Sequence, residues 1–216
     1  MLDRPVLPLF PLPLVVFPGQ PVPLHIFEER YKAMIADCRE AEAEGGSLPF
    51  VIAWQHRDKI EEIGCSLIVS QVLREMPDGR LHILCLGQQR VRIHEVMQDK
   101  PYFTAAVSFV EDDDEFVELE LLHRTLEKCL QVLELARREG GDPTAEPVEI
   151  EGEPNSFLLA HYAGLDLERR QELLRSTSER ERLEFLLQHF GAAETELERR
   201  GLARKRGGFN GSIHPN

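Results

Sequence analysis

The first 26 residues combine large apolar side chains with proline. Seven of the chain's fourteen prolines lie at or before Pro23, six of them within LPLFPLPLVVFPGQPVPL. Proline has no amide donor and fixes φ, so this segment is predicted to run extended, with strand pairing confined to VVF (15–17), to edges and to strand starts. We therefore expect a belt whose apolar side chains cover a hydrophobic core while its backbone makes few ladder bonds.

From Phe27 the apolar residues follow a helical period. They fall at offsets 0, 4, 7, 8 and 11, namely Phe27, Tyr31, Met34, Ile35 and Cys38. This stripe predicts a helix over about 27–43, ended by Gly45-Gly46. The β-branched and aromatic run LPFVIAW predicts a buried strand at 48–54.

A β-meander is predicted next. GCSLIVSQVLREM and RLHILCLG flank Pro77-Asp78-Gly79, which is typical of a hairpin turn. RVRIHEV and YFTAAVSFV continue the pattern after it. The first part of the chain is thus rich in β-strands, with one helix.

The pattern becomes helical after residue 111. The acidic run EDDDE precedes six residues with heptad-like steps, which predict a helix of about 24 residues closing at Gly140-Gly141: Leu119, Leu122, Leu126, Cys129, Leu133 and Ala136. Three shorter helices follow, the second capped by Asp166 and the third by Ser178 with capping-box spacing to Glu181. The leucine seam suits either packing against these helices, which we favour, or a homodimer.

These patterns predict a domain of strands over 1–111 and a helical domain over 112–200. An acidic, proline-containing linker is expected at 141–154. Residues 201–216 show no apolar period and are predicted to form a mobile basic tail.

Charge narrows the possible partners. The formal net charge is −13, and such an acidic chain repels a phosphate backbone, so nucleic-acid binding is unfavourable. The sequence contains no run of about 18 apolar residues, so no membrane-spanning helix is predicted. The hydrophobic N-terminal segment lacks a small-x-small cleavage site and contains helix-breaking prolines, so we expect no signal peptide and a cytoplasmic location.

The sequence contains no recognisable catalytic or metal-binding motif. The four cysteines form no C-x-x-C pair, and neither a phosphate-binding glycine loop nor a nucleophile elbow occurs. Among the histidines, His82 with His94 is the best pairing for a metal, and solvated imidazoles are the favoured interpretation. We expect no catalytic residue, no metal and no cofactor.

Four residues are candidates for contact with a partner. Arg90 and Arg92 stand two apart on a predicted strand, which indicates either a basic patch or the solvent face of that strand. Trp54, at a strand exit beside a polar loop that contains His56, could anchor a partner or pack in the core.

Several separated motifs resemble one family, the N-terminal domain of Lon proteases. They are LPLFPLPLVVFPGQPVPLHIFEERYKAMI, IGCSLIVSQVLREMPDGRLHILCLGQQRVRI, PYFTAAVSFVEDD and NSFLLAHYAGLDLERRQELLRSTSERERLEFL, over about residues 5–190. Ten residues match the family's motifs, and we assign them structural roles: Pro18, Phe27, Glu28, Arg30, Tyr31, Gly64, Gly79, Gly87, Arg90 and Arg92.

The resemblance implies an α+β fold, a PUA-like closed β-barrel with one helix followed by a C-terminal α-helical bundle. It implies the selection of polypeptide substrates and transfers no catalytic residue, because the Walker loop and the Ser–Lys dyad of full-length Lon are missing from this sequence. The leading hypothesis is a non-catalytic module, an adaptor in protein quality control, that binds unfolded or exposed hydrophobic segments through Trp54, His56, Arg90 and Arg92. The alternative is a small-molecule or RNA-binding PUA-like module.

Overall fold

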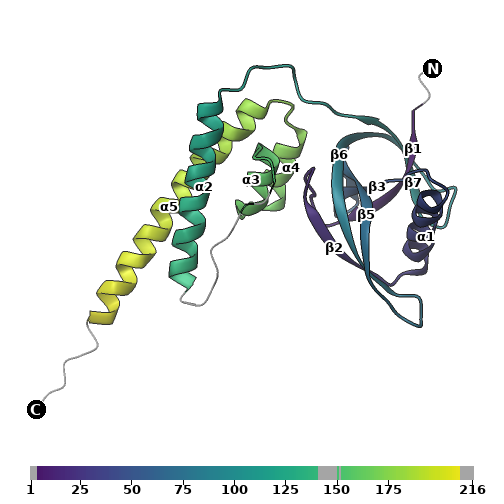
Figure 1. Cartoon of the computed structure of the whole chain (residues 1–216), viewed down its shortest axis with the longest axis horizontal. Helices are drawn as coiled ribbons and strands as arrows, with labels where there is room; N and C mark the ends of the chain where they lie inside the picture. The colour runs from purple at the N-terminus through teal and green to yellow at the C-terminus, as the bar shows by residue number, and fades with distance from the viewer. Residues whose placement is uncertain (1–3, 141–149, 151, 210–216) are drawn as a thin grey trace, which may run out of the picture. The chain divides into compact units, whose positions relative to one another are not determined.

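The computed structural model describes residues 4–140, 150 and 152–209. Seven strands and five helices are assigned in these residues (Figure 1). In chain order they are β1 (Val6–Leu12), β2 (Pro21–Ile26), α1 (Glu29–Ala43), β3 (Phe50–His56), β4 (Lys59–Ile60), β5 (Ile63–Glu75), β6 (Leu81–Met97), β7 (Phe103–Phe109), α2 (Leu119–Gly140), α3 (Ser156–Tyr162), α4 (Leu167–Arg175) and α5 (Glu179–Phe209).

The chain forms two compact units. The first consists of the described residues within 1–113 together with 165–177, and the second of those within 114–164 and from 178 onwards. Helix α4 therefore belongs to the unit that contains the strands, whereas the sequence analysis placed it in a helical domain over 112–200. The independence of the two predicted domains stays a prediction.

The strand order returns to its starting point. The sheet runs β1-β7-β6-β5-β3-β4, and β1 also pairs with β3. Strand β1 pairs antiparallel with β7 through Val6–Leu9 and parallel with β3 through Leu9–Leu12. These pairings connect β1, β7, β6, β5 and β3 in a ring, and with the five helices they give the mixed fold that the sequence predicts.

The proline-rich opening pairs more fully than the sequence analysis predicted. Residues 15–17, the predicted paired segment, lie outside every strand, whereas the proline-containing β1 and β2 are ladder strands. Alternate residues of a strand direct their amides to opposite sides. The carbonyl of Pro5 accepts from the amide of Val107 in β7, so the backbone positions of odd-numbered residues in β1 face β7 and those of even-numbered residues face β3. Pro8 therefore faces β3, but the β1–β3 pairing begins only at Leu9. Pro11 faces β7, but the β1–β7 pairing ends at Leu9.

Strand β2 accommodates its prolines differently. It pairs with β6 alone among the described strands, and the carbonyl of Gln20 accepts from the amide of Gly87. By alternation, the backbone positions of Pro21 and Pro23 face the open edge, where no amide is needed. Because no strand that the structure describes pairs at these backbone positions, proline occupies them without the loss of a ladder hydrogen bond.

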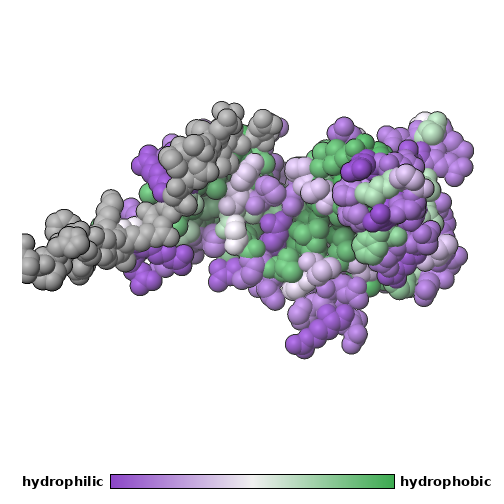
Figure 2. Space-filling model, turned by 90° about the horizontal axis from the view of Figure 1, so that it is seen from below, coloured by the Kyte–Doolittle hydropathy of each residue, from purple (hydrophilic) through white to green (hydrophobic). Residues whose placement is uncertain are grey.

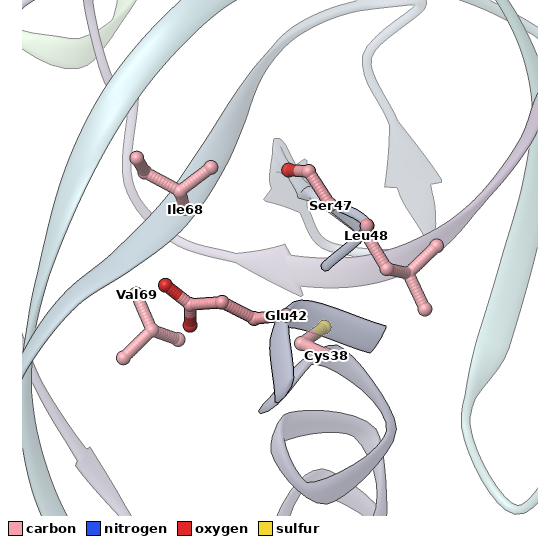
Figure 3. Close-up of a pocket in the computed structure, with 7 residues that line it drawn as sticks. Cys38, Glu42, Ser47, Leu48, Ile68 and Val69 are labelled. Carbon is pink, nitrogen blue, oxygen red and sulfur yellow. The ribbon is translucent and has the colours of Figure 1, made fainter. Parts of the chain in front are cut away.

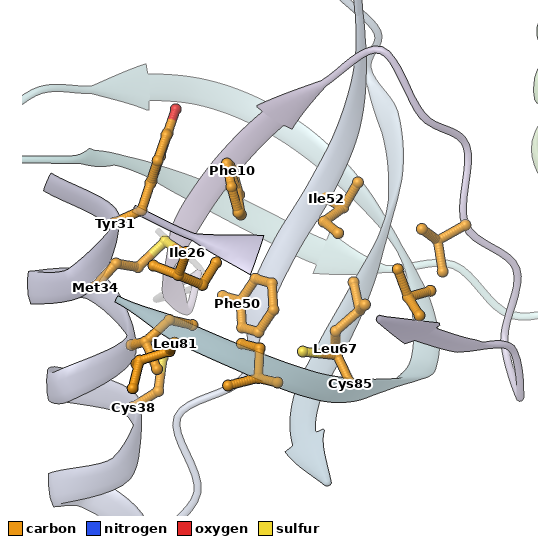
Figure 4. Close-up of a cluster of buried hydrophobic side chains, with 14 of the residues drawn as sticks. Phe10, Ile26, Tyr31, Met34, Cys38, Phe50, Ile52, Leu67, Leu81 and Cys85 are labelled. Carbon is orange, nitrogen blue, oxygen red and sulfur yellow. The ribbon is translucent and has the colours of Figure 1, made fainter. Parts of the chain in front are cut away.

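The core of this unit fills the space between the strands and α1. Helix α1 contributes Tyr31, Met34, Ile35 and Cys38, which are buried as predicted, whereas Phe27 precedes the helix and is 58 % exposed. Figure 4 shows the α1 side chains meeting Phe10, Phe50 and Leu67 from the strands. Gly45, with φ of +82°, follows the helix, as the sequence predicted.

In the second unit, the long helices α2 and α5 lie side by side (Figure 1). The predicted seam of α2 is buried only at Cys129, while Leu119 is 70 % exposed. Ser178 accepts from the amide of Glu181 at 3.0 Å, which confirms the predicted cap. Helix α5 continues to Phe209, so part of the predicted tail is helical, and residues 210–216 lie outside the described residues, as does most of the predicted linker.

Candidate functional site

Two of the predicted contact residues lie near the end of β3. The side chain of Trp54 is buried, with 8 % of its surface exposed, while that of His56 is exposed. The ring centroids of the two are 5.6 Å apart at an interplanar angle of 60°. Arg57, which follows, has φ of +56° in the turn between β3 and β4. The structure thus places His56 at the surface, over the edge of a largely buried indole.

The two predicted arginines lie in different surroundings. Arg90 is 3 % exposed and donates to the carbonyls of Leu174 and Ser176 at the end of α4, and to the carboxylate of Asp112. Arg92, two residues along β6, is exposed and lies 3.6 Å from a carboxylate oxygen of Glu62. Helix α4 thus covers the Arg90 side chain, which serves as a cap for the carbonyl end of that helix.

Helix α4 is held on the strands by further polar contacts. Arg170 donates to the carbonyl of Val15 at 3.0 Å and stacks on the ring of Phe17, with 4.3 Å between guanidinium and centroid. Arg175 pairs with Glu61, a carboxylate that also accepts from Lys59. Burial raises the pKa of Glu61, but the hydrogen bonds from Lys59 and Arg175 outweigh it and leave the pKa below its ordinary value.

A different surface of the same unit is open. Side chains of β2, β6 and β5 that alternate with core residues point away from the core. We call this surface the outer face. It is made of Pro21, Pro23, His25, Leu86, Leu84, His82, Ile68, Gln71 and Arg74.

The strand register arranges the outer face in three rows. Pro21, Leu86 and Ile68 form the first row, which is wholly apolar. Pro23 and Leu84 carry the apolar character into the second row, with Gln71 beside them. The three aliphatic side chains are half-buried and both prolines are exposed. Figure 2 shows hydrophobic (green) residues reaching the surface of the strand-containing unit between polar (purple) areas.

The third row is polar. His25 lies opposite His82, and His82 lies opposite Arg74. Nδ1 of His25 is 2.8 Å from Nε2 of His82. His82 and His94, the best pairing that the sequence offered for a metal, were placed on neighbouring strands, which is wrong, because both lie on β6. His94 contacts the hydroxyl of Ser108 at 2.8 Å.

A small pocket of about 120 Å³ opens between α1 and β5 (Figure 3). Its lining includes Cys38, Glu42, Leu48 and Val69. Burial raises the pKa of the Cys38 thiol to about 12, so this sulfur is protonated at neutral pH and is a poor nucleophile. The pocket has the size of a few water molecules, so it does not suit a cofactor.

The described residues contain no group of three or more His, Cys, Asp or Glu side chains that could hold a metal ion. No helix among them is both long enough and apolar enough to cross a membrane.

Sequence reasoning missed the outer face. Its apolar members alternate with core residues in PVPLHI and LHILCL, so the alternation was visible in the sequence. What was not visible was that β2 and β6 are neighbours, since this pairing joins strands more than 50 residues apart.

The comparisons with known proteins concern the whole fold. The family model described as the ATP-dependent protease La (LON) substrate-binding domain matches residues 6–190. Lon protease 2 of Herpetosiphon aurantiacus is 31 % identical over 193 residues, and Lon protease of Brevibacillus choshinensis is 30 % identical over 194. Each match covers 84 % of this chain, but only 23 % and 24 % of the relative, so the chain spans about a quarter of these proteins.

Solved structures agree with the sequence relatives. A Lon N-terminal domain protein from Xanthomonas campestris has 25 % identity and a TM-score of 0.61, with 85 % of this chain and 97 % of that chain covered. The N-terminal domain of a Mycobacterium avium complex Lon protease, at 20 % identity, has the same fold with a TM-score of 0.61, covering 87 % of this chain and 98 % of that one. Together with the match over residues 6–190, these likenesses show that the chain belongs to the family of Lon substrate-binding domains.

Proposed function

We propose that this chain is a polypeptide-binding module that holds exposed hydrophobic segments of other proteins on its outer face. The observation that carries the proposal is the apolar surface of the first two rows. Leu84, Leu86 and Ile68 are half-buried and, with the exposed Pro21 and Pro23, they lie next to one another across three paired strands. Contiguous apolar surface of this kind is typical of interaction sites. The match to a substrate-binding domain supports the same reading.

The contact is made through side chains, because the edge of β2 does not suit strand addition. An added strand needs amide donors along the edge it joins. Pro21 and Pro23 supply none at two alternate positions that face that edge. A bound segment therefore lies across the outer face, and we expect modest affinity with tolerance of different apolar sequences.

The test is a titration of a fluorescent, permanently unfolded protein with the purified chain. We expect a Kd on the order of 10 μM, and about tenfold weaker binding for the double variant Leu84→Ser/Leu86→Ser, equal to about 1.4 kcal/mol. The matched control is Phe109→Ser on β7, an apolar residue that is 47 % exposed away from the outer face. The proposal fails if the wild-type chain does not bind at about 100 μM, or if the control weakens binding as much as the double variant.

The residues predicted from the sequence remain a second candidate surface. His56 and Arg92 are exposed and can be tested as His56→Ala and Arg92→Ala in the same titration. If these variants lose binding and the Leu84→Ser/Leu86→Ser variant binds as tightly as the wild-type chain, the binding site lies around His56 and Arg92. Arg90 is engaged by α4, so a basic groove for RNA would have to form without it.

The wider role rests on the same features. The module acts in protein quality control as an adaptor that presents bound segments, a role supported by the family match to a substrate-binding domain. Free, buried thiols at all four cysteines suit a reducing cytoplasm. Partly exposed leucines along α2 could pack against a second copy of the chain. Light scattering of the purified chain tests whether it forms this homodimer.

A further inference from the structure

One end of the outer face differs chemically from the rest. The first two rows are mainly apolar, whereas the third row brings together two imidazoles and a guanidinium: His25, His82 and Arg74. All three come from different strands, so the cluster exists only in the folded sheet. The inference below rests on the proposed function and concerns which segments the outer face prefers.

The histidine pair always offers a donor. A contact of 2.8 Å between Nδ1 of His25 and Nε2 of His82 needs one N–H and one lone pair. If His25 donates, Nδ1 of His82 carries the other proton of the pair; if His82 donates, Nε2 of His25 carries it. In either tautomer the neutral pair therefore keeps one further N–H, on the ring that accepts.

Arg74 supplies the charge. It is exposed and makes no ion pair with any residue that the structure describes. Carboxylates at adjoining positions already have cationic partners: Glu75 with Arg39 at 3.6 Å, Asp78 with Arg80 at 2.7 Å, and Glu28 with Arg30 at 2.8 Å. The Arg74 guanidinium is thus the uncommitted cation of this region.

The spacing links the cation to the apolar rows. Leu86 and His82 are four residues apart on β6, or about 13 Å at the rise of a strand. This length corresponds to about four residues of an extended peptide. A peptide that places apolar side chains on the first two rows therefore brings its next residues to the third row.

We infer that the outer face prefers segments in which apolar residues are followed by an acidic side chain. The apolar residues contact Leu86, Leu84 and Ile68, and the carboxylate accepts from Arg74 and from the histidine pair. An ionised acceptor strengthens such hydrogen bonds, and a guanidinium can bind a carboxylate through two of them. The charge of −13 for the whole chain makes this local cation selective, since most of the remaining surface repels an acidic segment.

The experiment uses two fluorescent peptides that share an apolar core and end in Glu or in Gln, both with acetylated and amidated ends. Anisotropy titrations of the full chain are run in EDTA, so that a metal held by the histidines cannot contribute. We expect the Glu peptide to bind about fivefold more tightly. Arg74→Gln should abolish this preference and leave the Kd of the Gln peptide unchanged. His25→Ala should reduce the preference partly.

Arg92→Gln is the control variant, because Arg92 is an exposed arginine that pairs with Glu62 outside the three rows. It should keep the preference for Glu. Thermal unfolding of each variant checks that the fold is intact.

The outcomes separate the two proposals. Equal binding of both peptides by the wild-type chain overturns the acidic preference and leaves the proposed function standing. Absence of binding by either peptide at about 100 μM overturns both. A Gln peptide with a free C-terminal carboxylate forms a third arm, and if it binds as tightly as the Glu peptide, the third row recognises a chain terminus and the inference is wrong.

Discussion

The surface beneath α4 and the outer face both include side chains of β6 and both contain arginines, yet these arginines differ in burial and in partners. Under α4, Arg90 and Glu61 are largely buried and each has partners within the chain. On the outer face, Arg74 is exposed without an ion pair among the described residues, beside half-exposed leucines. The comparison teaches that the element packed over a strand, more than the strand's own sequence, decides whether a charged residue stabilises the fold or remains available to a partner.

Arg90→Ala is expected to have the largest effect on stability. It removes the guanidinium that donates to the carbonyls of Leu174 and Ser176 and to the carboxylate of Asp112. Losing a buried charged partner costs about 3 kcal/mol. Urea unfolding measures this loss, with Arg92→Ala as the matched control at less than about 0.5 kcal/mol. Equal effects of the two substitutions would contradict the assignment of Arg90 to the docking of α4.

Gly87→Ala is expected to come next. A Cβ on Gly87 would lie 2.3 Å from the carbonyl oxygen of Phe17, and the backbone there is tied to Gly19 and Gln20 by hydrogen bonds. Such overpacking costs about 2 kcal/mol. Gly191→Ala in α5, where nothing lies within 4 Å of the added atom, should instead stabilise by up to about 1 kcal/mol. A neutral Gly87→Ala in urea unfolding would show that residues 17–20 are less fixed than the contacts indicate.

Acid should weaken the region beneath α4 through Glu61. Its pKa is lowered in the folded chain, so its ion pairs contribute stability above the ordinary value near 4.5, and this contribution is lost as the pH falls through the folded value. Between pH 6 and pH 3, Glu61→Gln should therefore lose less stability than the wild-type chain. If the urea midpoints of the two proteins fall by the same amount over this pH range, Glu61 does not contribute to the loss of stability in acid.

The smallest effect is expected from thiol reagents. Burial raises the pKa of Cys65, Cys85 and Cys129 to about 12, as it does that of Cys38. At pH 8 the native chain should react with iodoacetamide far more slowly than the unfolded chain, at all four positions. Mass spectrometry after a timed pulse measures this, and fast labelling of any one cysteine would reveal local opening around it.

Much of the fold followed from local patterns. The period of residues 27–43, the turn at Gly79 and the cap at Ser178 each depend on residues a few positions apart, and the structure places helix α1, the β5–β6 hairpin and the start of α5 there. The predicted pairing of residues 15–17 was wrong, whereas the pairing of the proline-containing β2 at an edge agrees with the prediction. Strand β1 pairs on both sides, because each of its prolines faces a neighbour with which that part of the strand does not pair.

The sequence by itself determined the approximate positions of α1, of the β5–β6 hairpin and of the start of α5, and through its separated motifs it determined the family. Only the tertiary structure decided that β1 closes the ring, that α4 buries Arg90, and that His25 meets His82. The physical reason is distance along the chain. Periodicity and capping act within a few residues, whereas the burial and partners of a side chain are set by elements that can be 50 to 150 residues away, as Arg170 and Val15 illustrate.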